Sequence, residues 1–314
     1  MFDYSFQILT KHQPWILGGI IREVIPYCPG SVVVNEHLSL RRERLKKLII
    51  NKKNIEVGQV NILIHHQILD KIPERLLTDQ KYKHRILLTH FDPPSDVPSK
   101  LLNRLGCFDK ILVQNVEVKN QLLASGRMEK SSKVEVWYGA VDRETYFPTN
   151  TPKGDYVLIV GDCKPRKNPR LLAEIVATNL DLNFVIHGKG WLNDINIQKV
   201  INQKNLQIVP FNLGLNPALM RNASVLLSPS TLEGGPFPVL ESLASGTPVV
   251  VTATGFCSEI ISNERGECVP IGSDASSVSS AIHRTIEATN KTRRIDLLNG
   301  RFSWQELAIK LFNN

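Results

Sequence analysis

Two glutamates stand on either side of a short turn that contains glycine and proline. Glu233 precedes the run Gly-Gly-Pro-Phe-Pro, and Glu241 follows it. The apolar pattern predicts a strand that ends at Ser228 and a helix over about residues 236–245, with a proline in its first turn and a glycine after its end. The first amides of a helix have no partner within the helix and favour anions. The segment therefore combines two carboxylates with a group of amide donors.

The helix start offers few amides, because Pro236 and Pro238 have no N–H group. Carboxylates on both sides of such amides suit a ligand that has hydroxyls at both ends and phosphates between them, as in a sugar nucleotide. The alternative is a pair of surface carboxylates near a helix start, which the helix dipole alone would favour. The expected amide donors are Gly234, Gly235, Phe237 and Val239.

Alternating strands and helices must position these residues. Short runs rich in Val, Ile and Leu alternate with amphipathic stretches of helical length, as is typical of parallel strands buried on both faces. This pattern predicts an α/β protein with two doubly wound, Rossmann-like domains that face an interdomain cleft. The expected strands are Phe6–Thr10, Ser31–Val34, Asn61–His65, Arg85–Thr89, Lys110–Gln114, Lys133–Trp137, Tyr156–Val160, Asn183–His187, Gln207–Pro210, Val225–Ser228, Pro248–Thr252 and Glu267–Pro270.

The length of 314 residues fits two domains of ordinary size. Residues 147–154 have turn chemistry and no periodicity, so they are the expected linker. We expect a first domain over residues 1–150 and a second over 151–300. Residues 301–314 are expected to form a helix that packs back on the first domain.

Composition indicates a cytoplasmic protein. The five cysteines are scattered, no apolar run reaches about 18 residues, and the first residues lack the build of a signal peptide.

The net charge of +8 is unevenly distributed, because residues 1–150 hold 22 Lys+Arg and 16 Asp+Glu and so carry +6 of it. The basic residues 41–53 fit either a solvated surface helix or a helix that rests on the anionic inner face of a membrane. No stacking-aromatic and basic motif indicates nucleic-acid binding.

Residues 225–262 closely resemble the pattern of retaining GT-B glycosyltransferases of family 4, the glycosyl transferases group 1. That pattern is a serine-rich strand end, Glu-x7-Glu, Ala-x-Gly-x-Pro-Val-Val and Gly-Gly-x-x-Glu. This chain has the glutamate pair, Ala-Ser-Gly-Thr-Pro-Val-Val at 244–250, and Gly-Phe-Cys-Ser-Glu at 255–259, with Phe256 in place of the second glycine. The resemblance runs from about Trp15 to Trp304. It implies that the domain over residues 1–150 is on the acceptor side and that the domain over 151–300 binds the nucleotide sugar.

By this resemblance, Glu233 contacts the donor sugar and Glu241 contacts the ribose. Residues 160–169 resemble the family's diphosphate loop, whose lysine corresponds to Lys167. Asp162 stands where the family has an arginine, and either Arg166 or Lys164 is expected to supply the missing cation.

Further positions follow from the same resemblance. Gly161 belongs to the diphosphate loop, Gly188 to a Gly-x-Gly turn, and residues 209–211 to the segment that meets the nucleobase. Gly18 and Gly19 resemble the N-terminal glycine loop at the first strand–helix turn. His90 ends a Thr-x-His strand and would hold a donor-sugar hydroxyl near the anomeric centre.

The implied function is transfer of a sugar, with retention, from a UDP- or GDP-sugar to a glycan, lipid-linked or other hydroxyl acceptor, as in polysaccharide biosynthesis. The chain has no Asp-x-Asp motif and no cluster of ligands with metal spacing, so neither a metal nor another cofactor is expected. The alternatives are a non-catalytic partner subunit that keeps the GT-B fold and a sugar-nucleotide epimerase.

Overall fold

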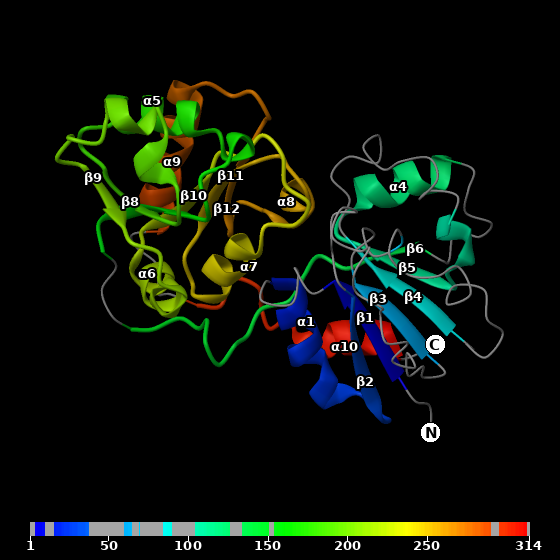
Figure 1. Cartoon of the computed structure of the whole chain (residues 1–314). Helices are drawn as coiled ribbons and strands as arrows, with labels where there is room; N and C mark the ends of the chain where they lie inside the picture. The colour runs from blue at the N-terminus through cyan, green and yellow to red at the C-terminus, as the bar shows by residue number, and fades with distance from the viewer. Residues whose placement is uncertain are drawn as a thin grey trace, which may run out of the picture. The chain divides into compact units, whose positions relative to one another are not determined.

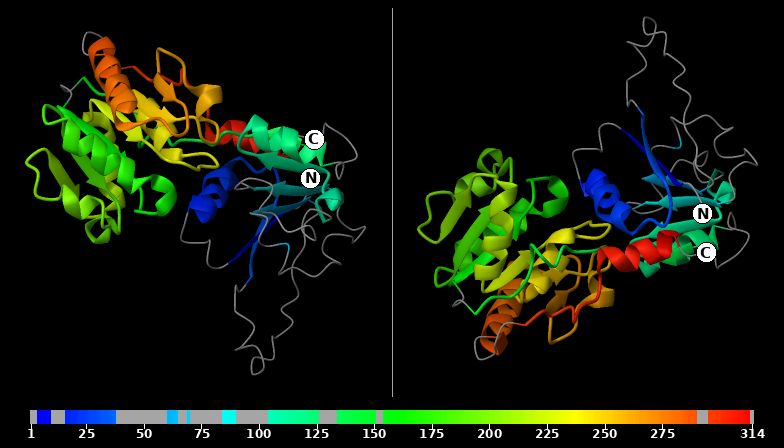
Figure 2. Two further views of the ribbon diagram at one scale, coloured as in Figure 1. Left: turned by 90° about the horizontal axis from the view of Figure 1, so that it is seen from above. Right: turned by 90° about the horizontal axis from the view of Figure 1, so that it is seen from below.

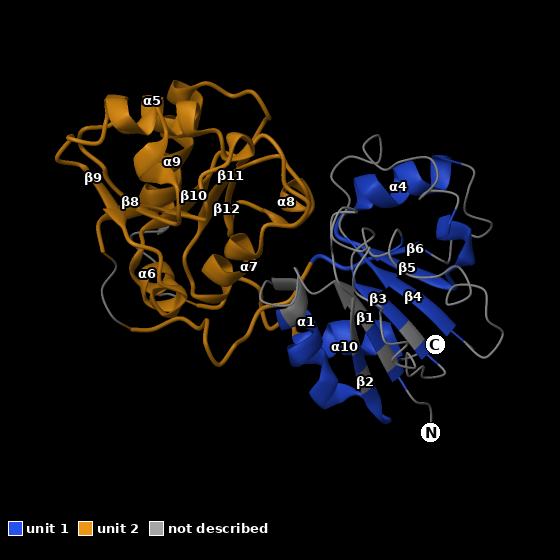
Figure 3. Cartoon of the chain, viewed as in Figure 1, with its two compact units in different colours: residues 1–138, 304–314 blue, residues 139–303 orange. Residues whose placement is uncertain are grey.

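The computed structural model describes residues 4–9, 16–37, 60–64, 69, 84–89, 104–125, 134–150, 154–289 and 295–312. The chain divides into two compact units (Figure 3). Unit 1 holds residues 1–138 and 304–314, and unit 2 holds residues 139–303.

Unit 1 is built on a six-stranded parallel sheet in the order β2-β1-β3-β4-β5-β6 (Figure 1). In register, Tyr4 pairs with Val32 on one side and with Val60 on the other. The strands are β1 (Tyr4–Leu9), β2 (Val32–His37), β3 (Val60–Ile64), β4 (His84–Leu88), β5 (Lys110–Val113) and β6 (Val134–Val136).

The helices of unit 1 pack on this sheet through buried apolar residues. The Asn115 side chain caps α4 by accepting from the amide of Val118 at 2.7 Å, and Leu122 of that helix is buried on the sheet. The C-terminal helix α10 packs against α1, and its Phe312 ring meets Tyr4 of β1 edge-on at 5.0 Å. Figure 2 shows α10, in red, with the blue and cyan elements of unit 1. The helices are α1 (Ile16–Val24), η2 (Ile25–Tyr27), η6 (Leu105–Cys107), α4 (Val116–Ala124) and α10 (Trp304–Phe312).

Unit 2 has a second parallel sheet with a different order, β12-β11-β10-β7-β8-β9. Its strands are β7 (Tyr156–Val160), β8 (Asn183–His187), β9 (Leu206–Val209), β10 (Val225–Ser228), β11 (Val249–Thr252) and β12 (Gly266–Val269). The chain runs from β7 outward to β9, then returns to the other side of β7 and runs outward to β12. The sheet therefore reverses its direction of growth between β7 and β10.

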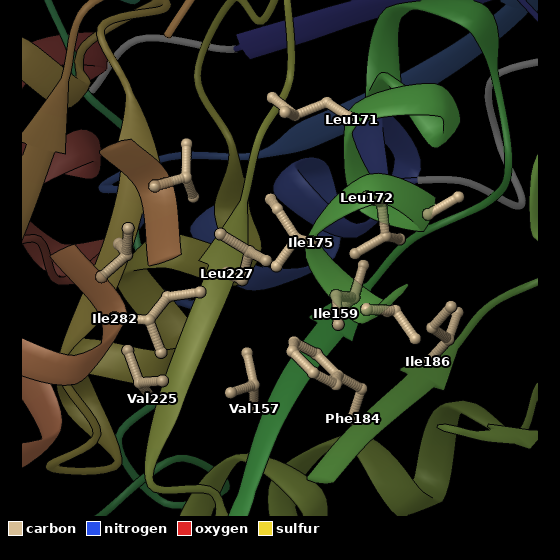
Figure 4. Close-up of a cluster of buried hydrophobic side chains, with 14 of the residues drawn as sticks. Val157, Ile159, Leu171, Leu172, Ile175, Phe184, Ile186, Val225, Leu227 and Ile282 are labelled. Atoms are coloured by element: carbon tan, nitrogen blue, oxygen red, sulfur yellow. The ribbon is translucent and has the colours of Figure 1, made fainter. Parts of the chain in front are cut away.

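Helices cover both faces of this second sheet. Helices α5 and α9 pack together on one face, while α6 and α7 pack together near β10 and β11 (Figure 1). Figure 4 shows the first face, where Leu172 and Ile175 of α5 meet Phe184 and Leu227 of the strands. The helices are η8 (Pro165–Lys167), α5 (Pro169–Thr178), η9 (Trp191–Asn193), η10 (Ile197–Lys199), η11 (Leu213–Leu215), α6 (Asn216–Asn222), α7 (Phe237–Ala244), α8 (Cys257–Ile260) and α9 (Ala275–Thr289).

The predicted fold class is confirmed, because every expected strand is present within three residues of its expected bounds. The division between the units lies before the expected linker at 147–154. Residues 139–150 belong to unit 2, since the amide of Val141 donates to the carbonyl of Phe302 at 2.9 Å and Arg143 pairs with Asp296. The helix at the C-terminal end belongs to unit 1.

One local expectation was wrong. Gly18 and Gly19 do not form a loop at a strand–helix turn, because α1 already begins at Ile16 and both glycines lie in its first turn. The apolar residues around them recur at helical spacing, which favours the helix over a turn. The basic residues 41–53 lie outside the described residues. Within the described part of the chain, no helix is long and apolar enough to span a membrane.

The core of unit 2 allows a matched test of its packing. Leu172 is 0% exposed, while Leu180 is 72% exposed. We expect Leu172→Ala to lower the free energy of unfolding by about 2–5 kcal/mol, because it removes buried methyl groups and leaves a cavity. Leu180→Ala is expected to change it by less than about 0.5 kcal/mol. Urea titration followed by circular dichroism measures both, and equal effects would contradict the described core.

Candidate functional site

The predicted site residues of unit 2 follow the carboxyl ends of β7, β8 and β10. These three strands are adjacent in the sheet, and the growth of the sheet reverses between β7 and β10. Open α/β sheets bind ligands outside such a reversal point, where two loops leave the sheet on opposite sides. Lys167 lies in the loop after β7, and Glu233 lies in the loop after β10.

Glu233 is the centre of a cluster of charged side chains. Its Oε1 atom lies 2.6 Å from Nζ of Lys167, and its Oε2 atom lies 2.5 Å from a guanidinium nitrogen of Arg166. The hydroxyl of Ser230 donates to Oε1 at 2.9 Å. The Glu233 side chain is only 8% exposed, so these three donors replace the water that it loses. We call Glu233, Lys167 and Arg166 the ion triad.

The ion triad fixes the protonation state of Glu233. Burial raises the pKa of this carboxyl group, but the charges of Lys167 and Arg166 and the hydrogen bonds from Lys167 and Ser230 lower it further, and the net shift is downward. Glu233 is therefore ionised at neutral pH. The triad carries two positive charges and one negative charge.

Hydrogen bonds to the backbone hold the loop of Glu233 in place. The amide of Thr231 donates to the carbonyl of Arg166 at 2.7 Å and so joins the loops after β10 and β7, and the hydroxyl of Thr252, at the end of β11, donates to the carbonyl of Ser230. Gly255 allows this loop to pack closely against the chain at residue 255, because a Cβ atom there would lie 2.6 Å from the carbonyl oxygen of Gly234. Its φ of +56° also favours glycine. Gly255, in the segment that resembles the family's Gly-Gly-x-x-Glu pattern, therefore has a structural role next to the loop that holds Glu233.

Two predicted glycines lie under the cationic side of the triad. A Cβ atom on Gly161 would lie 3.4 Å from Cε of Lys167, so the lysine chain crosses directly over it. A Cβ atom on Gly188 would lie 2.0 Å from the carbonyl oxygen of Gly161, which no side chain tolerates. These glycines therefore allow the loops after β7 and β8 to approach each other.

Asp162 has a structural role in this loop pair. Its Oδ1 atom accepts from the amide of Lys189 at 3.0 Å, and the carbonyl of Lys189 accepts from the amide of Cys163 at 2.8 Å. The carboxylate thus joins the β7 and β8 loops. Of the two cations considered as substitutes for the family arginine, Arg166 belongs to the ion triad, and its side chain is 43% exposed. Lys164 is exposed and precedes η8.

The helix after the turn matches its prediction, with Pro236 as the residue before its first turn. The amide of Val239 donates to the carbonyl of Pro236 at 2.9 Å, so Val239 is already engaged within the helix start. Glu241 lies in the second turn of α7.

Phe256, which stands where the family pattern has a glycine, is 0% exposed. Its side chain belongs to the core, which accounts for a phenylalanine at this position.

Glu241 differs from Glu233 in its surroundings. It retains some accessible surface, yet desolvation raises the pKa of its carboxyl group to about 7. A hydrogen bond from the hydroxyl of Tyr146 lowers this pKa in part. Sequence reasoning did not identify Tyr146, because the residue lies in the segment that was expected to lead into the linker. Asp142 and Tyr146 lie in one turn, and the sequence of this turn has no pattern typical of a binding site.

The structure thus brings together Glu233, Lys167 and Arg166, with Gly161 and Gly188 beneath them and Glu241 on the following helix. Gly234 and Gly235 lie between Glu233 and α7, and Phe237 is the first residue of that helix. His90 lies outside the described residues, and Gly18 and Gly19 belong to unit 1. Among the described residues, no group of three His, Cys, Asp or Glu side chains is placed to hold a metal ion.

Comparison with known proteins identifies the family of this segment. Residues 142–296 match the family described as Glycosyl transferases group 1. This segment of the chain belongs to that family. The match covers almost all of unit 2, including the ion triad and Glu241.

Curated relatives agree with this membership. A 99-residue stretch is 33% identical to the MMP alpha-(1->4)-mannosyltransferase of Mycolicibacterium hassiacum and covers 29% of this chain and 24% of that enzyme. A longer alignment of 328 residues is 23% identical to the GDP-mannose-dependent alpha-(1-6)-phosphatidylinositol dimannoside mannosyltransferase of Mycobacterium tuberculosis and covers 96% and 79% of the two chains. The aligned stretches span 24%, 42% and 40% of three curated relatives, which is less than half the length of each.

The solved structures extend the similarity to the whole fold. The lipopolysaccharide outer core galactosyltransferase WaaB in its apo form has a TM-score of 0.74 at 17% identity, covering 99% of this chain and 98% of that chain. The chain therefore has the GT-B fold, with two Rossmann-like units.

The ion triad predicts a dependence of stability on pH. Because the pKa of Glu233 is lower in the folded protein than its ordinary value of 4.5, its contribution is complete above that value and is lost as the pH falls through the folded pKa. We expect Glu233→Gln to lower the free energy of unfolding at neutral pH by about 1–3 kcal/mol, since Lys167 loses its counter-charge. The decline of stability between about pH 5 and pH 3 should become shallower.

Glu174→Gln is the matched control, because Glu174 pairs with Arg170 on the exposed surface of α5. Its effect should stay below about 0.5 kcal/mol at every pH. Urea titrations at several pH values measure both variants. An unchanged pH dependence in Glu233→Gln would contradict the assigned ionisation of Glu233.

Proposed function

We propose that this protein transfers a sugar from a nucleotide diphosphate sugar to a hydroxyl acceptor, with retention of anomeric configuration and without a metal ion. The observation that carries the proposal is the ion triad at the reversal point of the second sheet. An ionised carboxylate and two cations, one of them exposed, stand beside each other at the place where such sheets bind ligands. The family membership of this segment supports the same function.

In this proposal, the donor occupies the loops of unit 2. Glu233 accepts hydrogen bonds from hydroxyls of the donor sugar, because it is ionised and acceptor-only. Lys167 and Arg166 contact the diphosphate, whose charge exceeds the single positive charge that remains in the triad. Glu241 accepts from the ribose, while Gly234, Gly235 and Phe237 lie along the diphosphate and Gly161 and Gly188 leave room for it.

The reaction we propose takes place on one face of the sugar. The acceptor hydroxyl oxygen forms a bond to the anomeric carbon as the bond from that carbon to the diphosphate oxygen breaks. The electron pair of that bond leaves with the nucleoside diphosphate, and the hydroxyl proton passes to an oxygen of the leaving phosphate. Lys167 and Arg166 stabilise the developing negative charge electrostatically. His90 would hold a donor hydroxyl near the anomeric carbon, and Gly18 and Gly19 would approach the donor from unit 1.

The donor and acceptor are proposed only by class. The Mycobacterium tuberculosis relative is named as GDP-mannose-dependent, and the WaaB structure is named as a galactosyltransferase. Both UDP- and GDP-sugars are therefore candidate donors. The acceptor is proposed to be a saccharide or a lipid-linked saccharide in the cytoplasm, where the basic residues 41–53 would contact the inner face of an anionic membrane.

Glu233→Gln tests the role of the triad in transfer. We expect it to lower the turnover of the donor by at least about 100-fold, because the neutral side chain no longer orients the donor sugar against the paired cations. Release of UDP or GDP from a panel of sugar nucleotides measures turnover, and Glu174→Gln should match the wild type. Normal turnover in Glu233→Gln would refute the assignment. Binding of a donor by the wild type without any release would favour a non-catalytic partner subunit.

A second experiment tests the mode of transfer. Donor turnover should be unchanged by excess EDTA, because the cations of unit 2 and not a metal ion meet the leaving diphosphate. Proton NMR of the first-formed product should show the same anomeric configuration as the donor. Loss of activity with EDTA, restored by a divalent cation, would overturn the metal-independent proposal, and an inverted anomer would overturn retention.

A further inference from the structure

The carboxylate of Glu233 has an acceptor position that the described residues leave open. Its Oε1 atom contacts two donors, Nζ of Lys167 at 2.6 Å and the hydroxyl of Ser230 at 2.9 Å. Its Oε2 atom contacts a guanidinium nitrogen of Arg166 at 2.5 Å. Because each carboxylate oxygen accepts about two hydrogen bonds, Oε2 keeps one position for a ligand within the described part of the chain. The group that fills this position must be a donor, since an ionised carboxylate only accepts.

The open position lies on the side of the ion triad that water reaches. The side chain of Arg166 is 43% exposed, whereas those of Lys167 and Glu233 are 12% and 8% exposed. The Arg166 nitrogen that contacts Oε2 also donates to the carbonyl of Leu232 at 3.2 Å, so two contacts hold the guanidinium beside the carboxylate. A ligand therefore meets Oε2 and the exposed guanidinium together.

A phosphate group that contacts the cations of the triad must also lie close to the carboxylate. Charge-assisted hydrogen bonds are about 2.8 Å long, so a phosphate oxygen on the same nitrogen atom of Lys167 or Arg166 lies within roughly 5.5 Å of an oxygen of Glu233. At this distance two like charges repel by several times the thermal energy, even with the screening typical of a protein surface. Glu233 thus opposes every phosphate group that binds at the triad.

Sugar nucleotides and free nucleoside diphosphates differ in what they offer to this carboxylate. A sugar nucleotide carries hydroxyl donors next to its diphosphate, and its outer phosphate is esterified. A free nucleoside diphosphate has only phosphate oxygens at that end, and its outer phosphate gains a second negative charge above about pH 6. Hydroxyl donors offset the repulsion at Oε2, whereas additional phosphate charge increases it.

We propose that Glu233 is the residue by which the site distinguishes a sugar nucleotide from a free nucleoside diphosphate. Its charge opposes any diphosphate on Lys167 and Arg166, and a ligand with sugar hydroxyls offsets this repulsion at Oε2. Once the sugar has been transferred, the carboxylate competes with the product for both cations and favours its release. This inference rests on the proposed function, because it places the diphosphate on these cations.

A purely structural role of Glu233 predicts a different result. If the carboxylate only held the loops after β7 and β10 together, its loss would loosen both cations and weaken the binding of every ligand. In the proposed role, its loss strengthens the binding of the nucleoside diphosphate and leaves that of the sugar nucleotide nearly unchanged, because repulsion and hydroxyl contact are lost together. The sign of the change for the nucleoside diphosphate therefore separates the two roles.

Two variants of Glu233 separate its charge from its contacts. Glu233→Gln removes the charge and keeps the shape, while Glu233→Asp keeps the charge and shortens the side chain by one methylene. Glu174→Gln is the control, since Glu174 pairs with Arg170 on the exposed surface of α5. Calorimetry with excess EDTA at about pH 7.5, where the outer phosphate is ionised, measures the binding of UDP, GDP, UDP-glucose and GDP-mannose. Thermal unfolding of each variant shows that folded proteins are compared.

We expect Glu233→Gln to bind UDP or GDP at least about tenfold more tightly than the wild type, and the corresponding sugar nucleotide within about threefold of it. Glu233→Asp should bind the nucleoside diphosphate within about threefold of the wild type, because the charge stays near the phosphates. It should bind the sugar nucleotide about fivefold more weakly, since the hydroxyl contact is lost while the repulsion remains. Glu174→Gln should match the wild type with each ligand.

Weaker binding of UDP and GDP by Glu233→Gln would overturn the inference, and so would an equal gain for nucleoside diphosphates and sugar nucleotides. A gain for UDP or GDP in Glu233→Asp as large as in Glu233→Gln would also overturn it, because the charge is then not the cause. If Glu233→Gln does not fold, unchanged selectivity in Glu233→Asp has the same consequence. In these cases a wild type that binds and turns over a sugar nucleotide leaves the proposed function intact. A wild type that binds none of these ligands contradicts the proposed function itself, and the inference fails with it.

Discussion

The ion triad of Glu233, Lys167 and Arg166 is the interaction on which the described half of the site depends. It joins the loop after β7 to the loop after β10, and two of its three side chains are largely withdrawn from water. Charges in such a place are stable only when each has a partner, because the loss of one partner leaves the other desolvated and uncompensated. The triad therefore holds the two loops in one arrangement before any ligand is present.

The sheet topology determines why these two loops meet. The second sheet grows in opposite directions from β7 and β10, so the loops that follow these neighbouring strands leave on opposite sides. The small size of Gly161, Gly188 and Gly255 then allows the loops to approach one another and the strands beneath them. Strand order and close backbone packing are thus prerequisites for the charged contacts.

The two glutamates of the same segment show how surroundings decide the behaviour of one residue type. Glu233 is buried against two cations and a hydroxyl, and the pKa of its carboxyl group falls. Glu241 is desolvated with one neutral donor, and the pKa of its carboxyl group rises to about 7. The first is a permanent anion that organises cations, whereas the pKa of the second lies close to neutral pH because of its burial.

The sequence by itself determined the elements of this protein. Runs of Val, Ile and Leu mark most of the strands, and Pro236 with the glycine after α7 marks the bounds of the helix that contains Glu241. These features depend on neighbours along the chain, which is why periodicity and turn chemistry predict them. The resemblance also assigned Lys167 to the leaving diphosphate and Glu233 to the donor sugar, which spacing alone could not do, and it did not predict that the two side chains form an ion pair.

The tertiary structure alone decided which side chains meet. The unit boundary before Gly139 follows from contacts of Val141 and Arg143 with residues near 300, and Nδ1 of the buried His187 in β8 lies 2.6 Å from Oδ1 of Asn216 in α6. Asp162, which looked like a lost phosphate contact, serves instead as an acceptor for the neighbouring loop. Such partners depend on strand order and on the path of loops across the sheet, and no local pattern of residues records these.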